Sequence, residues 1–280
     1  MIIDSHTHAF PPTICRERER FFDNEPAFKL LYATPGSRLV GAAEIIDMMD
    51  AQGVDKSVLF GFPWRSADTF KANNDYVLDA VHRYPDRLVG FCCLDPLHPS
   101  APREVERCLG AGLSGVGELA FYTSGIDESC CEGLEPIMAL SRRHRCPVMI
   151  HTNEPVGHQY PGKTTNTLAQ IYAMVKRFPD NRIILAHWGG GLFLYTLLKK
   201  EVREALINVW YDTAASPFLY RPQIYQQAMA LAGEDKVLFG TDFPLLKPRR
   251  YFKEMDMAAL SPDQKNAVMG ANAAKLLHLE

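Results

Sequence analysis

Residues 236–242, with the sequence KVLFGTD, show most clearly which kind of fold this chain adopts. The run is apolar on both faces instead of alternating between apolar and polar residues, and RIILAH at 182–187 has the same character. A strand of this kind fits a parallel sheet with both faces covered, by helices on one side and by a barrel core on the other. The two segments therefore predict an α/β protein.

Short apolar runs of this type recur along the chain, each bounded by polar or turn residues and too short to be a buried helix. Segments with helical periodicity separate them, such as the one that contains Ile45, Met48 and Met49. We expect strands at 2–8, 56–62, 88–95, 113–120, 147–153, 182–188, 207–213 and 236–242. This strand-helix repetition is what a closed (β/α)8 barrel needs, whereas an open doubly wound sheet usually stops at about five to seven strands.

The whole chain, residues 1–280, is expected to form one domain, a distorted (β/α)8 TIM barrel. The one long connection is residues 9–40, whose mixture of Arg, Glu, Phe and Pro predicts an irregular inserted loop after the first strand. We expect this loop near the barrel mouth, as a lid or as a contact in a homodimer, since two-fold homo-oligomers are common.

Composition narrows the range of partners. The net charge is −3 and the basic residues are scattered, which argues against nucleic acid and favours a small-molecule substrate. There is no apolar run long enough for a membrane span and no signal pattern before the first strand, so we expect a cytoplasmic protein without membrane contact. The seven cysteines include no C-x-x-C pair and are expected to be reduced thiols that pack as small hydrophobic residues.

Ligand-type side chains stand at the ends of the expected strands. In a barrel, these ends meet at the mouth, where the active site lies. The residues concerned are His6 and His8 on the first strand, Glu118 on the fourth, His151 on the fifth, His187 on the sixth and Asp242 on the eighth. Imidazole with carboxylate is a ligand set for Zn2+, with Mn2+ or Fe2+ as alternatives. The pattern therefore predicts a divalent metal site.

In these features the chain resembles the amidohydrolase superfamily, and within it the amidohydrolase-related group that includes metal-dependent decarboxylases similar to aminocarboxymuconate-semialdehyde decarboxylase. The matching segments span the chain in the correct order. They are DSHTH at 4–8, VGELAF at 116–121, VMIHTNEPVG at 148–157, LAHWGGG at 185–191, FGTDFP at 239–244 and GANAAKLL at 270–277.

The resemblance implies a role for each matching residue. His6, His8, His151 and Asp242 would hold the principal metal, and His187 would polarise or orient the substrate. Glu118 stands where binuclear members carry a carbamylated lysine. We favour one ion with Glu118 as an additional ligand or as a neighbouring carboxylate, and the alternative is a Glu118 that bridges two ions, with His187 as a ligand of the second.

The main functional expectation is hydrolysis of a small amide, lactone or ester by a metal-activated water, with Asp242 as proton shuttle and His187 or the metal stabilising the oxyanion. The alternative is a metal-dependent, non-oxidative decarboxylase of an aromatic or dienoic acid. A second alternative, a non-catalytic metal-binding barrel, is disfavoured because the ligand set is complete.

Several loop residues are candidates for contact with a substrate, which would be an anion in the decarboxylase alternative. They are Arg65, His158, Tyr160, Trp188 and Lys247. The three glycines at 189–191 lack the spacing of a dinucleotide-binding motif. We expect them to let the backbone approach the site closely beside His187, with amides available to an anionic group.

Overall fold

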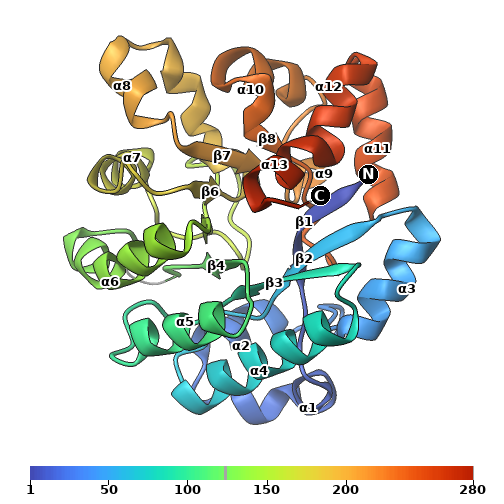
Figure 1. The fold of residues 1–280 in the computed structure, drawn as a ribbon, viewed down its shortest axis with the longest axis vertical. Helices are drawn as coiled ribbons and strands as arrows, with labels where there is room; N and C mark the ends of the chain where they lie inside the picture. Colours follow the sequence, from blue (N-terminus) through green and yellow to red (C-terminus); the bar gives the residue numbers. More distant parts are fainter. Residues whose placement is uncertain (123–124, 280) are drawn as a thin grey trace.

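Eight parallel strands follow one another around the molecule in chain order (Figure 1). The computed structural model describes residues 1–122 and 125–279. The strands are β1 (Ile3–His8), β2 (Lys56–Phe60), β3 (Leu88–Cys92), β4 (Gly115–Leu119), β5 (Val148–Ile150), β6 (Ile183–Leu185), β7 (Val209–Asp212) and β8 (Val237–Leu238). The structure thus confirms the (β/α)8 barrel that the sequence predicts.

The ring is closed between its first and last strands by residues 239–243, which follow β8. The Ser5 N–H donates to the Phe239 carbonyl at 2.8 Å, and the Asp242 N–H donates to the His6 carbonyl at 2.9 Å. The expected eighth strand ran to Asp242, but the regular ladder ends at Leu238. The chain leaves the ladder there and turns, so that Asp242 faces the mouth.

The helices lie outside the strands (Figure 1). They are α1 (Pro12–Arg16), η1 (Arg18–Phe21), α2 (Pro26–Tyr32), α3 (Ala42–Gln52), α4 (Ala67–Arg83), α5 (Ala101–Gly110), α6 (Glu128–His144), α7 (Leu168–Arg177), η2 (His187–Leu197), α8 (Lys200–Ala205), α9 (Ser216–Leu219), α10 (Ile224–Ala232), η3 (Glu234–Lys236), α11 (Pro248–Met257), α12 (Pro262–Asn266), η4 (Ala267–Ala271) and α13 (Asn272–Leu277). Within the described ranges, no helix combines the length and the apolar character that crossing a bilayer requires.

The segment at 9–40 differs from the irregular loop that we expected, because it contains α1, η1 and α2. Pro12 and Pro26 are the first residues of the two α-helices, a position where the missing N–H of proline costs nothing. Phe28 of α2 is buried in the main hydrophobic core. The insertion therefore packs as an integral part of the molecule.

Two apolar layers hold the barrel. The inner layer consists of alternate strand residues such as Val58 and Phe60, while Leu59 between them faces the outer layer under the helices. Leu276 and Leu277 of α13 join the inner layer. These residues help to fill the barrel interior, and the polar residues gather beyond the carboxyl ends of the strands.

The seven cysteines are free thiols, and all but Cys15 are buried. This agrees with the expectation that they pack as small hydrophobic residues.

Candidate metal centre

The first strand brings two imidazoles to the carboxyl end of the barrel. One residue separates His6 from His8, so their side chains lie on the same side of β1, with ring centroids 5.3 Å apart. The Gly61 carbonyl oxygen lies 3.0 Å from His8 Nδ1, and His8 Nε2 lies 3.1 Å from Asp242 Oδ1. His6 Nε2 lies 3.7 Å from Asp242 Oδ1 and from Glu118 Oε2. Residues from three distant parts of the chain thus meet at one point.

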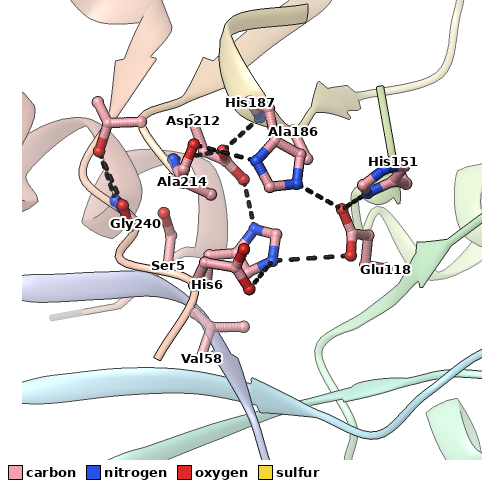
Figure 2. A network of polar contacts seen from close by, with 12 residues as sticks. Ser5, His6, Val58, Glu118, His151, Ala186, His187, Asp212, Ala214 and Gly240 are labelled. Carbon is pink, nitrogen blue, oxygen red and sulfur yellow. Dashed lines mark hydrogen bonds and ion pairs between the residues drawn. The ribbon is translucent and has the colours of Figure 1, made fainter. Parts of the chain in front are cut away.

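Glu118 on β4 is the carboxylate that four imidazoles approach, and Figure 2 shows three of them, those of His6, His151 and His187. Its Oε1 lies 2.9 Å from His151 Nδ1 and 3.5 Å from His187 Nε2. Its Oε2 lies 3.7 Å from His6 Nε2 and 3.9 Å from His8 Nε2. Burial raises the pKa of Glu118, but the neighbouring imidazoles, first His151 and then His6, lower it well below its usual value. The carboxylate is therefore ionised at the centre of the cluster.

Asp242 and His187 lie in turns that follow β8 and β6. Both have left-handed backbone conformations, with φ of 60° and 54°. Such conformations are strained for residues with a Cβ and persist where surrounding contacts fix them. The His187 N–H donates to Asp212 Oδ1 at 2.9 Å, and His187 Nδ1 lies 3.0 Å from the Ala214 carbonyl. These contacts leave His187 Nε2 directed at the centre.

Asp212, the last residue of β7, is a site residue that the sequence reasoning did not single out. Its Oδ2 lies 2.8 Å from His6 Nδ1, and its Oδ1 accepts the N–H groups of His187 and Ala214. The side chain is fully buried. A carboxylate that holds the far nitrogen of an imidazole fixes the orientation of the ring and the position of its proton. Its position in the sequence could have indicated a role in the site, because Asp212 ends a strand, as the other ligand-type residues do.

The donor set fits a divalent metal. His6 Nε2 is buried and has no hydrogen-bond partner among the described residues, although two carboxylates lie near it. A buried polar atom without a partner calls for an explanation, and a cation at this point supplies one. Three overlapping groups of residues place their donor atoms within 4.8 Å of one another: His6, His8 and Glu118; His6, His187 and Asp242; and Glu118, His151 and His187.

The electrostatics of the imidazoles support the same conclusion. Burial lowers the pKa of His6, but the carboxylates of Asp212 and Glu118 outweigh it and raise this pKa to about 10. Burial likewise lowers the pKa of His187, and Glu118 contributes most to raising it to about 9. The cluster thus stabilises positive charge in its interior, and a bound metal ion would supply that charge in place of the protons.

His151 lies directly after β5, beneath the loop at 154–163. Its Nε2 lies 2.9 Å from the Gly162 carbonyl oxygen. The loop is held by the ammonium group of Lys163, whose side chain is only 4% exposed and whose Nζ lies 3.0 Å from Glu154 Oε1. A loop that is ordered by its own side chains therefore reaches the centre through one backbone carbonyl.

The structure does not gather the candidate substrate-binding residues as it gathers the ligand-type residues. Arg65, His158 and Lys247 are exposed. Tyr160 is partly buried and donates its hydroxyl to a carboxylate oxygen of its own loop. Trp188 is fully buried in the main core, with its ring 5.0 Å from that of Tyr225. The indole thus lies among core side chains.

Two of the three glycines at 189–191, which we expected to let the backbone approach the site, pack closely against neighbouring segments. The availability of their amides to an anionic group stays a prediction. A Cβ on Gly190 would lie 2.3 Å from the Asn153 carbonyl oxygen, and one on Gly189 would lie 2.8 Å from the Tyr211 ring. Both glycines have a φ of 61°. At Gly189 and Gly190 the backbone can therefore follow this path only without side chains.

The chain is similar to known decarboxylases in sequence. It is 26% identical over 266 residues to the 2-amino-3-carboxymuconate-6-semialdehyde decarboxylase of Dictyostelium discoideum, covering 80% of this chain and 71% of the relative. It is 24% identical over 289 residues to the gamma-resorcylate decarboxylase of Polaromonas sp. strain JS666, covering 84% and 86%.

Solved structures share the fold. The 5-carboxyvanillate decarboxylase of Sphingomonas paucimobilis superimposes with a TM-score of 0.78 at 20% identity, over 100% of this chain and 99% of the other. The dihydroxybenzoic acid decarboxylase of Polaromonas sp. JS666, solved with manganese and the inhibitor 2-nitroresorcinol, gives 0.73 at 19% identity over 99% and 97%. The family model described as Amidohydrolase matches residues 3–279, and the chain therefore belongs to this family.

Proposed function

We propose that the protein is a metal-dependent decarboxylase that removes carbon dioxide, without oxidation, from a small hydroxylated aromatic carboxylic acid. Hydrolysis was the main expectation from the sequence, but the relatives support the decarboxylase alternative better, because those named above are decarboxylases. The structural observation that carries the metal dependence in this proposal is the buried His6 Nε2 without a partner among the described residues, surrounded by imidazoles and carboxylates. A complete donor set also favours catalysis over a non-catalytic barrel.

In this proposal His6, His8, His151 and Asp242 hold one divalent ion, with Glu118 as an additional ligand or a neighbouring carboxylate. When bound, the ion would supply positive charge that fixes an anionic substrate and stabilises the charge that develops on it. Manganese is the first ion to test, ahead of the zinc expected from the sequence. It is present in the Polaromonas enzyme and in the 5-carboxyvanillate decarboxylase of Novosphingobium aromaticivorans.

The side chains of the centre then have separate tasks. The bond between the ring carbon and the carboxyl carbon breaks, its electron pair stays on the ring carbon, carbon dioxide leaves, and the ring carbon takes a proton. Asp242 is the carboxyl group that we assign to pass this proton, because its side chain is 17% exposed, against 5% for Glu118 and 0% for Asp212. Burial raises the pKa of Asp242, but His8 and His6 lower it below its usual value, so this carboxylate takes the proton from solvent during the reaction and then delivers it. His187 Nε2 would contact a substrate oxygen, since Nδ1 is occupied by the Ala214 carbonyl.

Parallel assays test this function. The protein is purified without chelator, its metal content is measured, and it is then loaded with Mn2+. Carbon dioxide release is measured with 2,6-dihydroxybenzoate and 5-carboxyvanillate, and cleavage is measured with simple lactones, esters and amides. We expect carbon dioxide release and, in D2O, one deuterium at the ring carbon that lost the carboxyl group. Cleavage of a lactone, ester or amide without carbon dioxide release would overturn the proposal in favour of hydrolysis.

A further inference from the structure

An unbroken series of aromatic side chains borders the centre and joins two of its imidazoles, His8 and His151. Phe10, which follows β1, stacks on His8 with centroids 6.5 Å apart and planes 14° apart. Tyr32, the last residue of α2, contacts the Phe10 ring edge-on at 5.6 Å. The insertion after the first strand thus places a phenol beside the metal-type residues of that strand.

The series continues on the other side of Tyr32. The Phe62 ring, which follows β2, lies 6.0 Å from that of Tyr32 and stacks on that of Tyr122 at 5.9 Å, with planes 12° apart. The Tyr122 ring in turn lies 5.5 Å from that of His151. We call Phe10, Tyr32, Phe62 and Tyr122 the aromatic arc.

The arc combines a buried apolar base with two phenols that are less buried. Phe10 and Phe62 are at most 1% exposed, whereas Tyr32 and Tyr122 are partly exposed. Within residues 1–122 and 125–279, neither phenol hydroxyl has a hydrogen-bond partner, although both side chains are packed in place. Arg18 fixes the end of α2, since its Nη1 donates to the carbonyls of Tyr32 and Ser37 at 3.3 and 2.6 Å.

Both hydroxyls lie within the electrostatic reach of the centre. Burial is the largest cause that raises the pKa of Tyr32, and the carboxylates of Asp242 and Glu118 raise it further. Burial is also the largest cause that raises the pKa of Tyr122. The Glu118 carboxylate and the Tyr32 phenol raise this pKa further. The two phenols therefore stay protonated at neutral pH and can donate hydrogen bonds.

We infer that the aromatic arc lines the substrate-binding site and determines which ring substituents the site accepts. The rings of Tyr32 and Tyr122, which the buried Phe10 and Phe62 support from behind, contact a planar substrate ring, and their hydroxyls donate to oxygen substituents of that ring. The inference rests on the proposed function for the reaction, but it concerns binding: it names Tyr32 and Tyr122 as the residues that select a ring with a hydroxyl substituent. A ring without oxygen substituents would leave both phenol groups unpaired near the centre, which weakens its binding.

The test measures the binding of two probes to the manganese-loaded protein. 2-Nitroresorcinol carries two ring hydroxyls, and nitrobenzene is the matched probe without them. Tyr32→Phe and Tyr122→Phe remove one hydroxyl each and keep the ring. Tyr172→Phe on α7, outside the barrel, is the control, because it also removes a buried hydroxyl without a partner in the described structure.

We expect the unaltered protein to bind 2-nitroresorcinol at least about tenfold more tightly than nitrobenzene. Each arc variant should lose about three- to tenfold in affinity for 2-nitroresorcinol, the range for one neutral hydrogen bond, and change less than about twofold for nitrobenzene. Tyr172→Phe should change neither affinity. The inference is overturned if the unaltered protein does not distinguish the probes, if both arc variants keep their affinity for 2-nitroresorcinol, or if they lose affinity for both probes equally.

The same variants separate this inference from the proposed function. If no hydroxybenzoic acid releases carbon dioxide but the probe discrimination depends on Tyr32 and Tyr122, the decarboxylase proposal fails and the arc remains a binding wall. If carbon dioxide is released and Tyr32→Phe and Tyr122→Phe have unchanged KM and probe affinity, the function stands and the arc has only a packing role.

Discussion

The metal centre and the loop at 154–163 touch each other but are held in opposite ways. In the centre, hydrogen bonds join residues far apart in the chain, such as His6 and Asp212, which are 206 positions apart. In the loop they join near neighbours, such as Lys163 and Glu154, nine positions apart. The closed barrel therefore fixes the positions of the residues in the centre. The loop is held by hydrogen bonds among its own residues, and its Gly162 carbonyl contacts His151 of the centre. Changes in the centre should abolish chemistry or metal binding, and changes in the loop should alter substrate binding only.

Removal of the metal should have the largest effect. Dialysis against a chelator should lower the rate of carbon dioxide release by about a thousandfold or more, because a bound ion contributes several kcal/mol of charge stabilisation. Added Mn2+ should restore the rate, and the melting temperature should fall on stripping and recover on reloading. Activity that survives complete removal of cations would show that the cluster is not a catalytic metal site.

Asp242→Asn should come next. Asparagine preserves the shape of the side chain but cannot hold the transferable proton, so kcat should fall by about 10²- to 10⁴-fold. The metal content, measured by mass spectrometry of the purified protein, should stay close to that of the unaltered protein. Asp180→Asn, at an exposed position, is the control. Full activity in Asp242→Asn would remove this residue from the proposed proton transfer.

Asp212→Asn tests how far the centre depends on bonds across strands. The Asp212 carboxylate contacts the Nδ1 atom of His6 and accepts the backbone N–H groups of His187 and Ala214. An asparagine at this position must therefore point its NH2 group at one of these N–H donors, which cannot accept a hydrogen bond. Metal affinity, measured by chelator competition, should fall by about 10- to 100-fold. An unchanged affinity would mean that His6 is oriented by its strand alone.

Lys163→Met should have the smallest effect. It removes the ammonium group that binds Glu154 and the Val156 carbonyl and leaves an apolar side chain of similar length. Because these contacts lie within the loop, we expect KM to rise by a few-fold, with metal affinity unchanged. A loss of bound metal in this variant would show that the loop and the centre are not separate in the way the comparison implies.

The same contrast explains what the sequence could predict. The recurring apolar runs and the H-x-H spacing both reflect the geometry of single strands, so the barrel could be predicted from local patterns. The convergence of the ligand-type residues then follows from their place at strand ends; they are His6, His8, His151, His187 and Asp242. Asp212 also ends a strand, but it lies outside the segments that resemble the family.

The candidate substrate-binding residues were harder to predict, because their positions depend on packing between distant segments. Trp188 follows His187 directly, yet its left-handed backbone, with φ of 62°, turns the indole into the core. Tyr32 lies in a segment read as an irregular loop, where two prolines at helix starts were the available sign of structure. No periodicity in the sequence indicates that this ring would pack against Phe10 and Phe62.

The seam that closes the barrel also joins the segments that carry His6, His8 and Asp242. Thr241 donates its N–H to Asp4 Oδ1 and its hydroxyl to Asp4 Oδ2, and the next residue bonds to the His6 carbonyl. Two segments 237 positions apart in the chain must therefore pair before His6, His8 and Asp242 can reach the same ion. Metal uptake during refolding should accordingly follow the pairing of these two segments.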